Sequence, residues 1–122
     1  WRTRMSEVAI TRTEWLQVCK RSDLVANSGV CALVGGRQIA LFFLPEQESQ
    51  LYAIDNWDPV ANAGVIGRGI VAEIDGELTV ASPLYKQHYR LTDGQCLEEA
   101  DIQLAAYPVA FEGDDVLIKF DQ

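Results

Sequence analysis

The fold class is decided by residues 30–44, which read VCALVGGRQIALFFL. Gly35 and Gly36 separate two apolar runs, and a Gly-Gly pair readily adopts the positive φ angles of a tight hairpin turn. Short apolar runs that lack helical periodicity and end at turn residues are typical of β-strands. The sequence therefore predicts an antiparallel hairpin formed by residues 30–34 and 37–44.

Similar short runs that predict strands lie both before and after this hairpin. Residues 70–74 and 77–81 flank Asp75-Gly76, which predicts a second hairpin of the same kind. Helix is expected only as a turn near residues 22–26, and further strands are predicted at residues 14–19, 51–54, 89–91, 95–97, 104–111 and 116–120. Pro108 predicts an edge or a bulge, because proline cannot donate to a strand ladder. About 9–11 short antiparallel strands at this spacing indicate an all-β sandwich or small barrel.

Length and composition indicate a single globular domain. The chain has 122 residues, of which 48% are hydrophobic, and no apolar run approaches the ~20 residues that a membrane-spanning helix needs. A net charge of −8 would repel nucleic acid and anionic membranes, so neither is expected as a partner. Residues 1–5 do not resemble a secretory signal, and we interpret residues 1–4 as an extension ahead of a natural start at Met5.

The cysteines indicate a reducing compartment. Cys19, Cys31 and Cys96 are odd in number and widely spaced, which fits neither a disulfide framework nor a zinc ribbon. Each has apolar neighbours, so a buried free thiol is the favoured interpretation, with a reactive thiol as the alternative. The cysteines therefore predict a cytoplasmic protein.

Two long loops, residues 55–68 and 82–87, hold most of the unusual residues and are the expected place for a functional site. Asp55 and Asp58 could share acid–base work, but a turn-forming role before Pro59 is favoured. The glycines of the first loop do not predict a phosphate site, because a strand rather than a helix follows them; they are Gly64, Gly67 and Gly69.

His88 is the only histidine, which limits the catalytic possibilities. Ser82, His88 and Asp58 could form a triad, but nothing around Ser82 resembles a nucleophile elbow. No metal site is expected either, because each common histidine site needs further ligands that the sequence lacks. We therefore predict no catalytic residue and no bound metal.

A basic stripe follows the second loop. Lys86, His88 and Arg90 alternate along a predicted strand, so their side chains point to the same face. This stripe is either a solvated strand face or a docking surface for an acidic partner. In the second case Trp57 and Tyr85 would be aromatic anchors, of the kind enriched at interfaces.

The two loops carry a resemblance to a known family. Residues 53–60, AIDNWDPV, and residues 82–97, SPLYKQHYRLTDGQCL, resemble the two cluster loops of Rieske-type ferredoxins. In that family one loop carries Cys-x-His and the other Cys-x-x-His, and together they hold a 2Fe-2S cluster. The resemblance implies a Rieske-type fold with a two-loop subdomain at residues 55–97. It places the four ligand positions on Asp58, Val60, Ser82 and Tyr85.

None of these four residues is a cluster ligand. Val60 has no lone pair, and the oxygens of the other three are hard donors that are poorly matched to sulfide-bridged iron. They are also too few for calcium, which prefers six or more oxygen ligands. We therefore expect no cofactor on this chain, and we expect Trp57, Pro83 and Tyr85 to fill the volume of the cluster.

The runs DNWDP in the first loop and SPLYKQ in the second are similar to those of a narrower family, the small subunits of bacterial assimilatory NAD(P)H-dependent nitrite reductases. This resemblance implies an accessory subunit that docks on a large subunit. The large subunit would carry FAD, sirohaem and an iron–sulfur cluster and reduce nitrite to ammonia. Two alternatives stay open: an electron-transfer ferredoxin with oxygen ligands, and a module that binds a small molecule between its loops.

Overall fold

The computed structural model describes residues 14–47, 49–84 and 87–120 of the chain. The residues proposed as an N-terminal extension, the candidate start Met5, and two candidate site residues, Tyr85 and Lys86, lie outside the described residues. Nearly all regular structure within these ranges is strand: β2 (Glu14–Lys20), β3 (Ser28–Val34), β4 (Arg37–Phe43), β5 (Leu51–Asp55), β6 (Trp57–Asp58), β7 (Ala63–Gly64), β8 (Ile70–Ile74), β9 (Glu77–Ala81), β10 (His88–Arg90), β11 (Ala106–Tyr107), β12 (Val109–Glu112) and β13 (Asp115–Phe120). Two short 3-10 helices, η1 (Arg21–Asp23) and η2 (Ile66–Arg68), complete the list. The all-β prediction is therefore confirmed.

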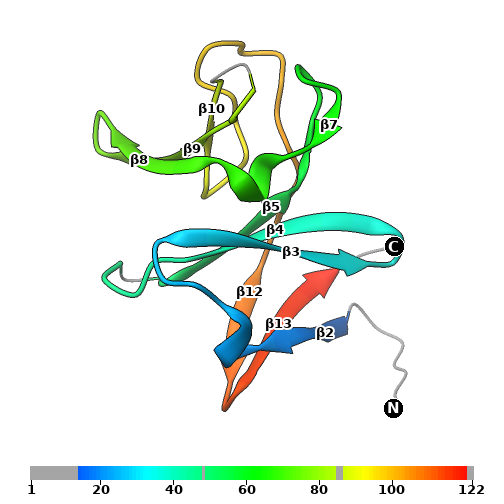
Figure 1. The fold of residues 1–122 in the computed structure, drawn as a ribbon. Coiled ribbons are helices and arrows are strands. Elements are labelled where there is room, and N and C mark those ends of the chain that lie inside the picture. Colours follow the sequence, from blue (N-terminus) through cyan, green and yellow to red (C-terminus); the bar gives the residue numbers. More distant parts are fainter. Residues whose placement is uncertain (1–13, 48, 85–86, 121–122) are drawn as a thin grey trace.

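Ten of the described strands form three layers, which Figure 1 shows stacked from top to bottom, and β6 and β7 form a separate two-stranded sheet. The central sheet has the order β11-β5-β4-β3, and every paired strand in it is antiparallel to its neighbour. The sheet β12-β13-β2 lies on one face of the central sheet, and the sheet β10-β9-β8 lies on the other. The described helices are too short and too polar to cross a membrane.

The central strand β4 explains why three layers are needed. Ile39 and Leu41 point into the core shared with β2 and β13, whereas Ala40 and Phe42 point into the core shared with β8, β9 and β10. All four side chains are buried. A strand that is apolar on both faces must be covered on both sides, because each exposed face would leave apolar surface in water.

The hairpin predictions at residues 30–44 and 70–81 are confirmed, and β8 and β9 have the predicted bounds. The predicted strand at 104–111 is wrong as a single element. It breaks at Pro108, where the chain leaves the central sheet after β11 and enters the outer sheet as β12. The chain can change sheets at Pro108 because proline has no N–H to pair.

Two further predictions need correction. Gln95 and Cys96 form only isolated bridges, to Gln103 and Tyr89, because the chain bends at Leu97 and Glu98. The first loop is more ordered than predicted, since it contains the small hairpin β6-β7 and the helix η2. These two-residue strands raise the number of described strands to twelve, against the expected 9–11.

Candidate functional site

The two long loops lie beside each other at the ends of β5 and β9, and a buried asparagine fixes the base of the first. The Asn56 side chain donates to Gln38 Oε1 at 3.0 Å and accepts from the Gly67 N–H at 2.7 Å. Its backbone N–H also donates to Gln38 O at 3.0 Å. Asn56 therefore ties the start of the loop both to β4 and to η2. Asn56 was not among the predicted site residues, although an asparagine directly after an apolar strand is a common anchor for a turn.

Asp58 organises the tip of the first loop. Its Oδ1 accepts a hydrogen bond from the Val60 N–H at 3.0 Å, and its backbone oxygen accepts from the Asn62 N–H at 2.7 Å. This arrangement confirms the turn-forming role predicted for Asp58. Asp55 does not share the site, because its Oδ1 accepts from the Tyr107 hydroxyl at 2.7 Å.

The same Asp58 carboxylate joins three segments of the chain. The Ser82 hydroxyl donates to Asp58 Oδ2, and the Tyr89 hydroxyl donates to Oδ1 at 2.8 Å. Asp58, Ser82 and Tyr89 are all buried. We call these three residues, together with the Val60 N–H, the Asp58 network.

Tyr89 was not among the predicted site residues, and strand alternation is the signal that could have found it. On β10 it lies between His88 and Arg90, so it points to the opposite, inner face. A buried tyrosine hydroxyl usually finds a hydrogen-bond partner, and here the partner is a carboxylate. Burial raises the pKa of the Tyr89 phenol strongly, and the hydrogen bond to Asp58 and the negative charge of Asp58 raise it further.

The structure does not assemble the Ser82–His88–Asp58 triad. His88 Nδ1 lies 2.6 Å from Glu98 Oε2, and the His88 backbone N–H donates to Glu98 Oε1 at 2.8 Å. Partial burial opposes ionisation of Glu98, but the hydrogen bonds and charge of His88 outweigh it and lower the pKa of this carboxyl. Ser82 and Asp58 are hydrogen-bonded to each other, whereas His88 is hydrogen-bonded to Glu98.

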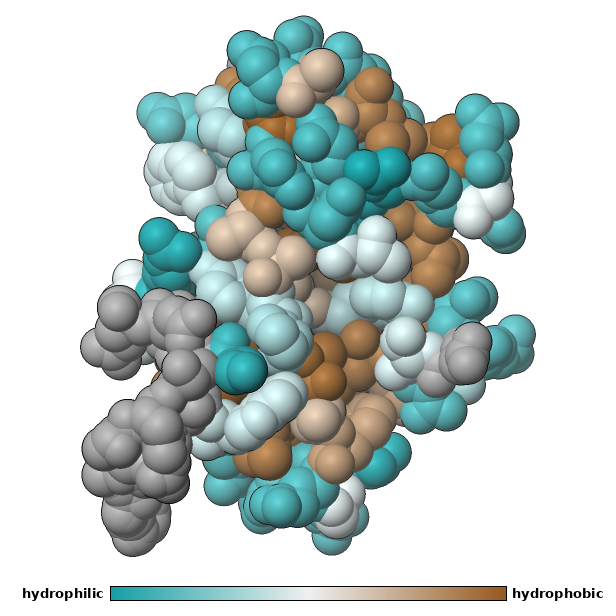
Figure 2. Space-filling view, turned by 180° about the vertical axis from the view of Figure 1, so that it is seen from behind, coloured by the Kyte–Doolittle hydropathy of each residue, from teal (hydrophilic) through white to brown (hydrophobic). Residues whose placement is uncertain are grey.

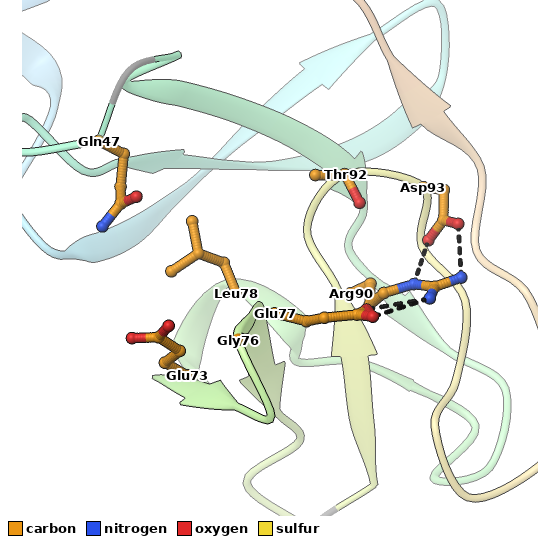
Figure 3. Close-up of a pocket in the computed structure, with 8 residues that line it drawn as sticks. All are labelled: Gln47, Glu73, Gly76, Glu77, Leu78, Arg90, Thr92 and Asp93. Atoms are coloured by element: carbon orange, nitrogen blue, oxygen red, sulfur yellow. Dashed lines mark hydrogen bonds and ion pairs between the residues drawn. The ribbon is translucent and has the colours of Figure 1, made fainter.

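Arg90 is also engaged within the chain, as Figure 3 shows. Its Nε and Nη2 donate to Asp93 at 3.0 and 2.7 Å, and its Nη1 donates to Glu77 at 2.9 Å. The Arg90 hydrogen bonds lower the pKa of the Asp93 carboxyl. These groups line an open cavity of about 430 Å³, which Glu73 makes more acidic. Within the described part of the predicted basic stripe, His88 and Arg90 therefore both face carboxylates of the same chain.

The described residues do not fit a 2Fe-2S cluster. The resemblance implies four ligand positions. Asp58 and Ser82 are hydrogen-bonded to each other, the Val60 side chain has no atom that can bind a metal, and Tyr85 lies outside the described residues. Across residues 14–47, 49–84 and 87–120, no three His, Cys, Asp or Glu side chains come together as a metal site. The three cysteines are free and scattered.

One packing prediction is wrong. Trp57 and Pro83 were expected to fill the volume between the loops, but both are exposed, and 49% of the Trp57 surface is accessible. The space between the loops is instead spanned by the shorter side chains of Asp58 and Ser82. Strand alternation gives the reason for Trp57, because Asp58 points inward and its neighbour must point outward.

The three-layer fold and the two adjoining loops define the chain as a Rieske-like domain. A family model described as a Rieske-like 2Fe-2S domain matches residues 14–119. The chain is 46% identical over 95 residues to the NADH nitrite reductase small subunit of Salmonella typhimurium, an alignment that spans 78% of this chain and 87% of that protein. The chain belongs to the family of nitrite reductase small subunits.

A solved structure agrees with this assignment. The solution structure of the NAD(P)H nitrite reductase small subunit from Erwinia carotovora is 49% identical, with a TM-score of 0.74, over 88% of this chain and 82% of that one. A further relative is a much longer protein, of which this chain matches only a segment. The NAD(P)H nitrite reductase large subunit of Klebsiella oxytoca is 37% identical over 112 residues, which are 92% of this chain but 11% of that protein.

Proposed function

We propose that this chain is an accessory subunit that docks on the large subunit of a cytoplasmic NAD(P)H-dependent nitrite reductase. The observation that carries the proposal is the Klebsiella oxytoca large subunit, which contains a segment similar to 92% of this chain. A domain that is a separate chain in one organism and part of a large subunit in another is expected to work beside that large subunit. The three free cysteines are consistent with a reducing cytoplasm.

In this proposal the large subunit carries the redox centres, namely FAD, sirohaem and an iron–sulfur cluster, and reduces nitrite to ammonia. This chain contributes no electron carrier of its own. Both oxygens of the Asp58 carboxylate already accept hydrogen bonds, and oxygen ligands suit hard cations rather than a sulfide-bridged iron pair. The small subunit would therefore act through contact with the large subunit.

The loop face is the proposed contact surface, and we define it as Trp57, Pro59, Pro83 and Leu84. All four are exposed; Trp57 and Leu84 are accessible over 49% and 54% of their surface. Figure 2 shows hydrophobic side chains among hydrophilic ones on the upper part of the molecule, which contains the two loops in Figure 1. Exposed aromatic and apolar groups of this kind anchor protein interfaces.

The remaining candidates from the sequence fall into two groups. Tyr85 and Lys86 directly follow Leu84, and we include them in the proposed contact as sequence neighbours. His88 and Arg90 are paired with Glu98, Glu77 and Asp93, so we place them outside the contact surface. With a net charge of −8 on this chain, the complementary surface would be apolar with a basic rim.

Co-expression with the large subunit tests this proposal, and the chain offers a matched control. Trp57 and Trp15 are both about half exposed, at 49% and 45%, but Trp15 lies on the outer strand β2. We expect the wild-type chain and Trp15→Ala to co-purify with the large subunit and Trp57→Ala to be lost or weakened. Failure of the wild-type chain to co-purify would show that the proposed function is wrong.

A further inference from the structure

The Asp58 network sits directly beneath the loop face. Trp57 and Pro59 flank Asp58 in the first loop, and Pro83 and Leu84 follow Ser82 in the second. The two buried residues are hydrogen-bonded to each other, while these four residues of the loop face are exposed. The bond therefore joins the two loops at the residues adjacent to their exposed apolar side chains.

We propose that Asp58 and Ser82 are positioning residues, which hold the two halves of the loop face in the arrangement that binds the large subunit. This inference rests on the proposed function, because it assumes that the loop face docks. It goes further by assigning a role to buried residues that do not themselves reach the partner.

The hydrogen bonds support this role because they come from three separate segments. Ser82 is 24 residues from Asp58 and Tyr89 is 31 residues away, whereas the Val60 N–H belongs to the turn that follows Asp58. Within the described ranges, the bond from Ser82 to Asp58 is the hydrogen bond that links the first loop to the second. Its loss would leave the first loop attached through the hydrogen bond from Tyr89 on β10, through the loop ends and through core packing.

The buried Asp58 carboxylate needs several hydrogen-bond donors. The carboxylate is buried, and the ion pairs among the described residues involve other carboxylates. A buried carboxylate is tolerated when several donors satisfy its oxygens. Removal of one donor therefore favours opening of the loop, because water would then replace the missing hydrogen bond.

The positions match the resemblance found in the sequence. Asp58 and Ser82 occupy the two cysteine positions of the cluster frame, one in each loop. In the ferredoxins those two positions are joined through a cluster, and here they are joined by one hydrogen bond. The cross-link between the loops is thus retained by different chemistry.

The test compares Ser82→Ala with Thr79→Val. Thr79 is also buried, and its hydroxyl also makes one hydrogen bond, to Ala72 O at 2.9 Å within the hairpin β8-β9. Both variants therefore remove one buried hydroxyl from the same sheet region, but only Ser82→Ala unlinks the loops. The readouts are the Kd for the cofactor-loaded large subunit and amide hydrogen exchange at Val60 and Asn62.

We expect Ser82→Ala to speed exchange at Val60 and Asn62 and to weaken binding. If the loops keep the docking arrangement about a tenth of the time, the apparent Kd rises about tenfold. Thr79→Val should change neither readout. Tyr89→Phe serves as a second variant, because it removes a donor to Asp58 and leaves the loops linked, and it should weaken binding less.

The outcomes separate this inference from the proposed function. If the wild-type chain binds and Ser82→Ala binds and exchanges like Thr79→Val, the positioning role is wrong and the proposed function stands. If the wild-type chain does not bind the large subunit, the proposed function is wrong and the docking role of the network falls with it. Unchanged exchange at Val60 in Ser82→Ala would overturn the cross-link itself.

Discussion

The Tyr89 hydroxyl should contribute to stability in a way that depends on pH. Tyr89→Phe removes the hydroxyl that donates to Asp58 Oδ1 at 2.8 Å, while the Val60 N–H still donates to the same atom. A hydrogen bond to a charged group contributes about 1.5–3 kcal/mol, so we expect a loss of about 2 kcal/mol at pH 7. For a domain of this size that corresponds to a fall in Tm of about 8 °C.

The difference in the free energy of unfolding between the wild-type chain and Tyr89→Phe should become smaller at alkaline pH. Burial and the Asp58 carboxylate raise the pKa of Tyr89 in the folded chain, whereas in the unfolded chain the phenol ionises above about pH 10. The raised pKa therefore stabilises the fold fully below about pH 10, and this contribution is lost as the pH rises further. The wild-type chain should lose about 1.4 kcal/mol per pH unit from this group, and Tyr89→Phe should lose none of it.

Urea unfolding followed by circular dichroism, from pH 7 to pH 11, measures this difference. Other alkaline groups titrate in both proteins and cancel when the two free energies of unfolding are subtracted. A difference below about 0.5 kcal/mol at pH 7 would show that the hydroxyl is not bonded to a charged, buried partner. A difference that stays constant above pH 10 would show that the fold does not hold Tyr89 in its protonated form.

Three further predictions concern the turn after β10, the ion pairs and the cluster loops. Gly94→Ala should lower the free energy of unfolding by about 4 kcal/mol or more in thermal unfolding, because φ is +78° and the added Cβ would lie 2.1 Å from Leu104 O. Gly76→Ala is the control: φ is +83° but the site is open, so the loss should be about 1–2 kcal/mol. Arg90→Ala should lower Tm, because it removes the ion pairs of Arg90 with Glu77 and Asp93, but it should leave the Kd for the large subunit unchanged. A raised Kd would show that Arg90 belongs to the contact surface. Anaerobic reconstitution with iron and sulfide should give no Rieske-type absorption or paramagnetic signal, and a stoichiometric signal would support the ferredoxin alternative.

Local patterns in the sequence were sufficient for most of the fold. The Gly-Gly and Asp-Gly turns predicted two hairpins, because turn geometry depends on a few adjacent residues. The switch of sheets at Pro108 was not predicted. Proline indicates a break in pairing, but the sheet that the chain enters next is decided by packing between distant segments.

The candidate site was predicted less completely, and for a similar reason. The sequence singled out Asp58 and Ser82, but not the bond between them or the contribution of Tyr89. Trp57 was expected between the loops and is half exposed. Which of two neighbouring residues points inward depends on the register of short strands such as β6, and a two-residue strand leaves almost no periodic signal in the sequence.

A titration of the large subunit with this chain tests the proposed accessory role. The measured quantity is NAD(P)H-dependent nitrite reduction, with chain shown by elemental analysis to contain no iron. We expect the iron-free chain to raise activity, or to slow its loss, up to a saturating ratio. Activity that is indifferent to the chain, or that responds only after an iron–sulfur cluster has been assembled on it, would show that the chain is not an accessory subunit that acts without its own cluster.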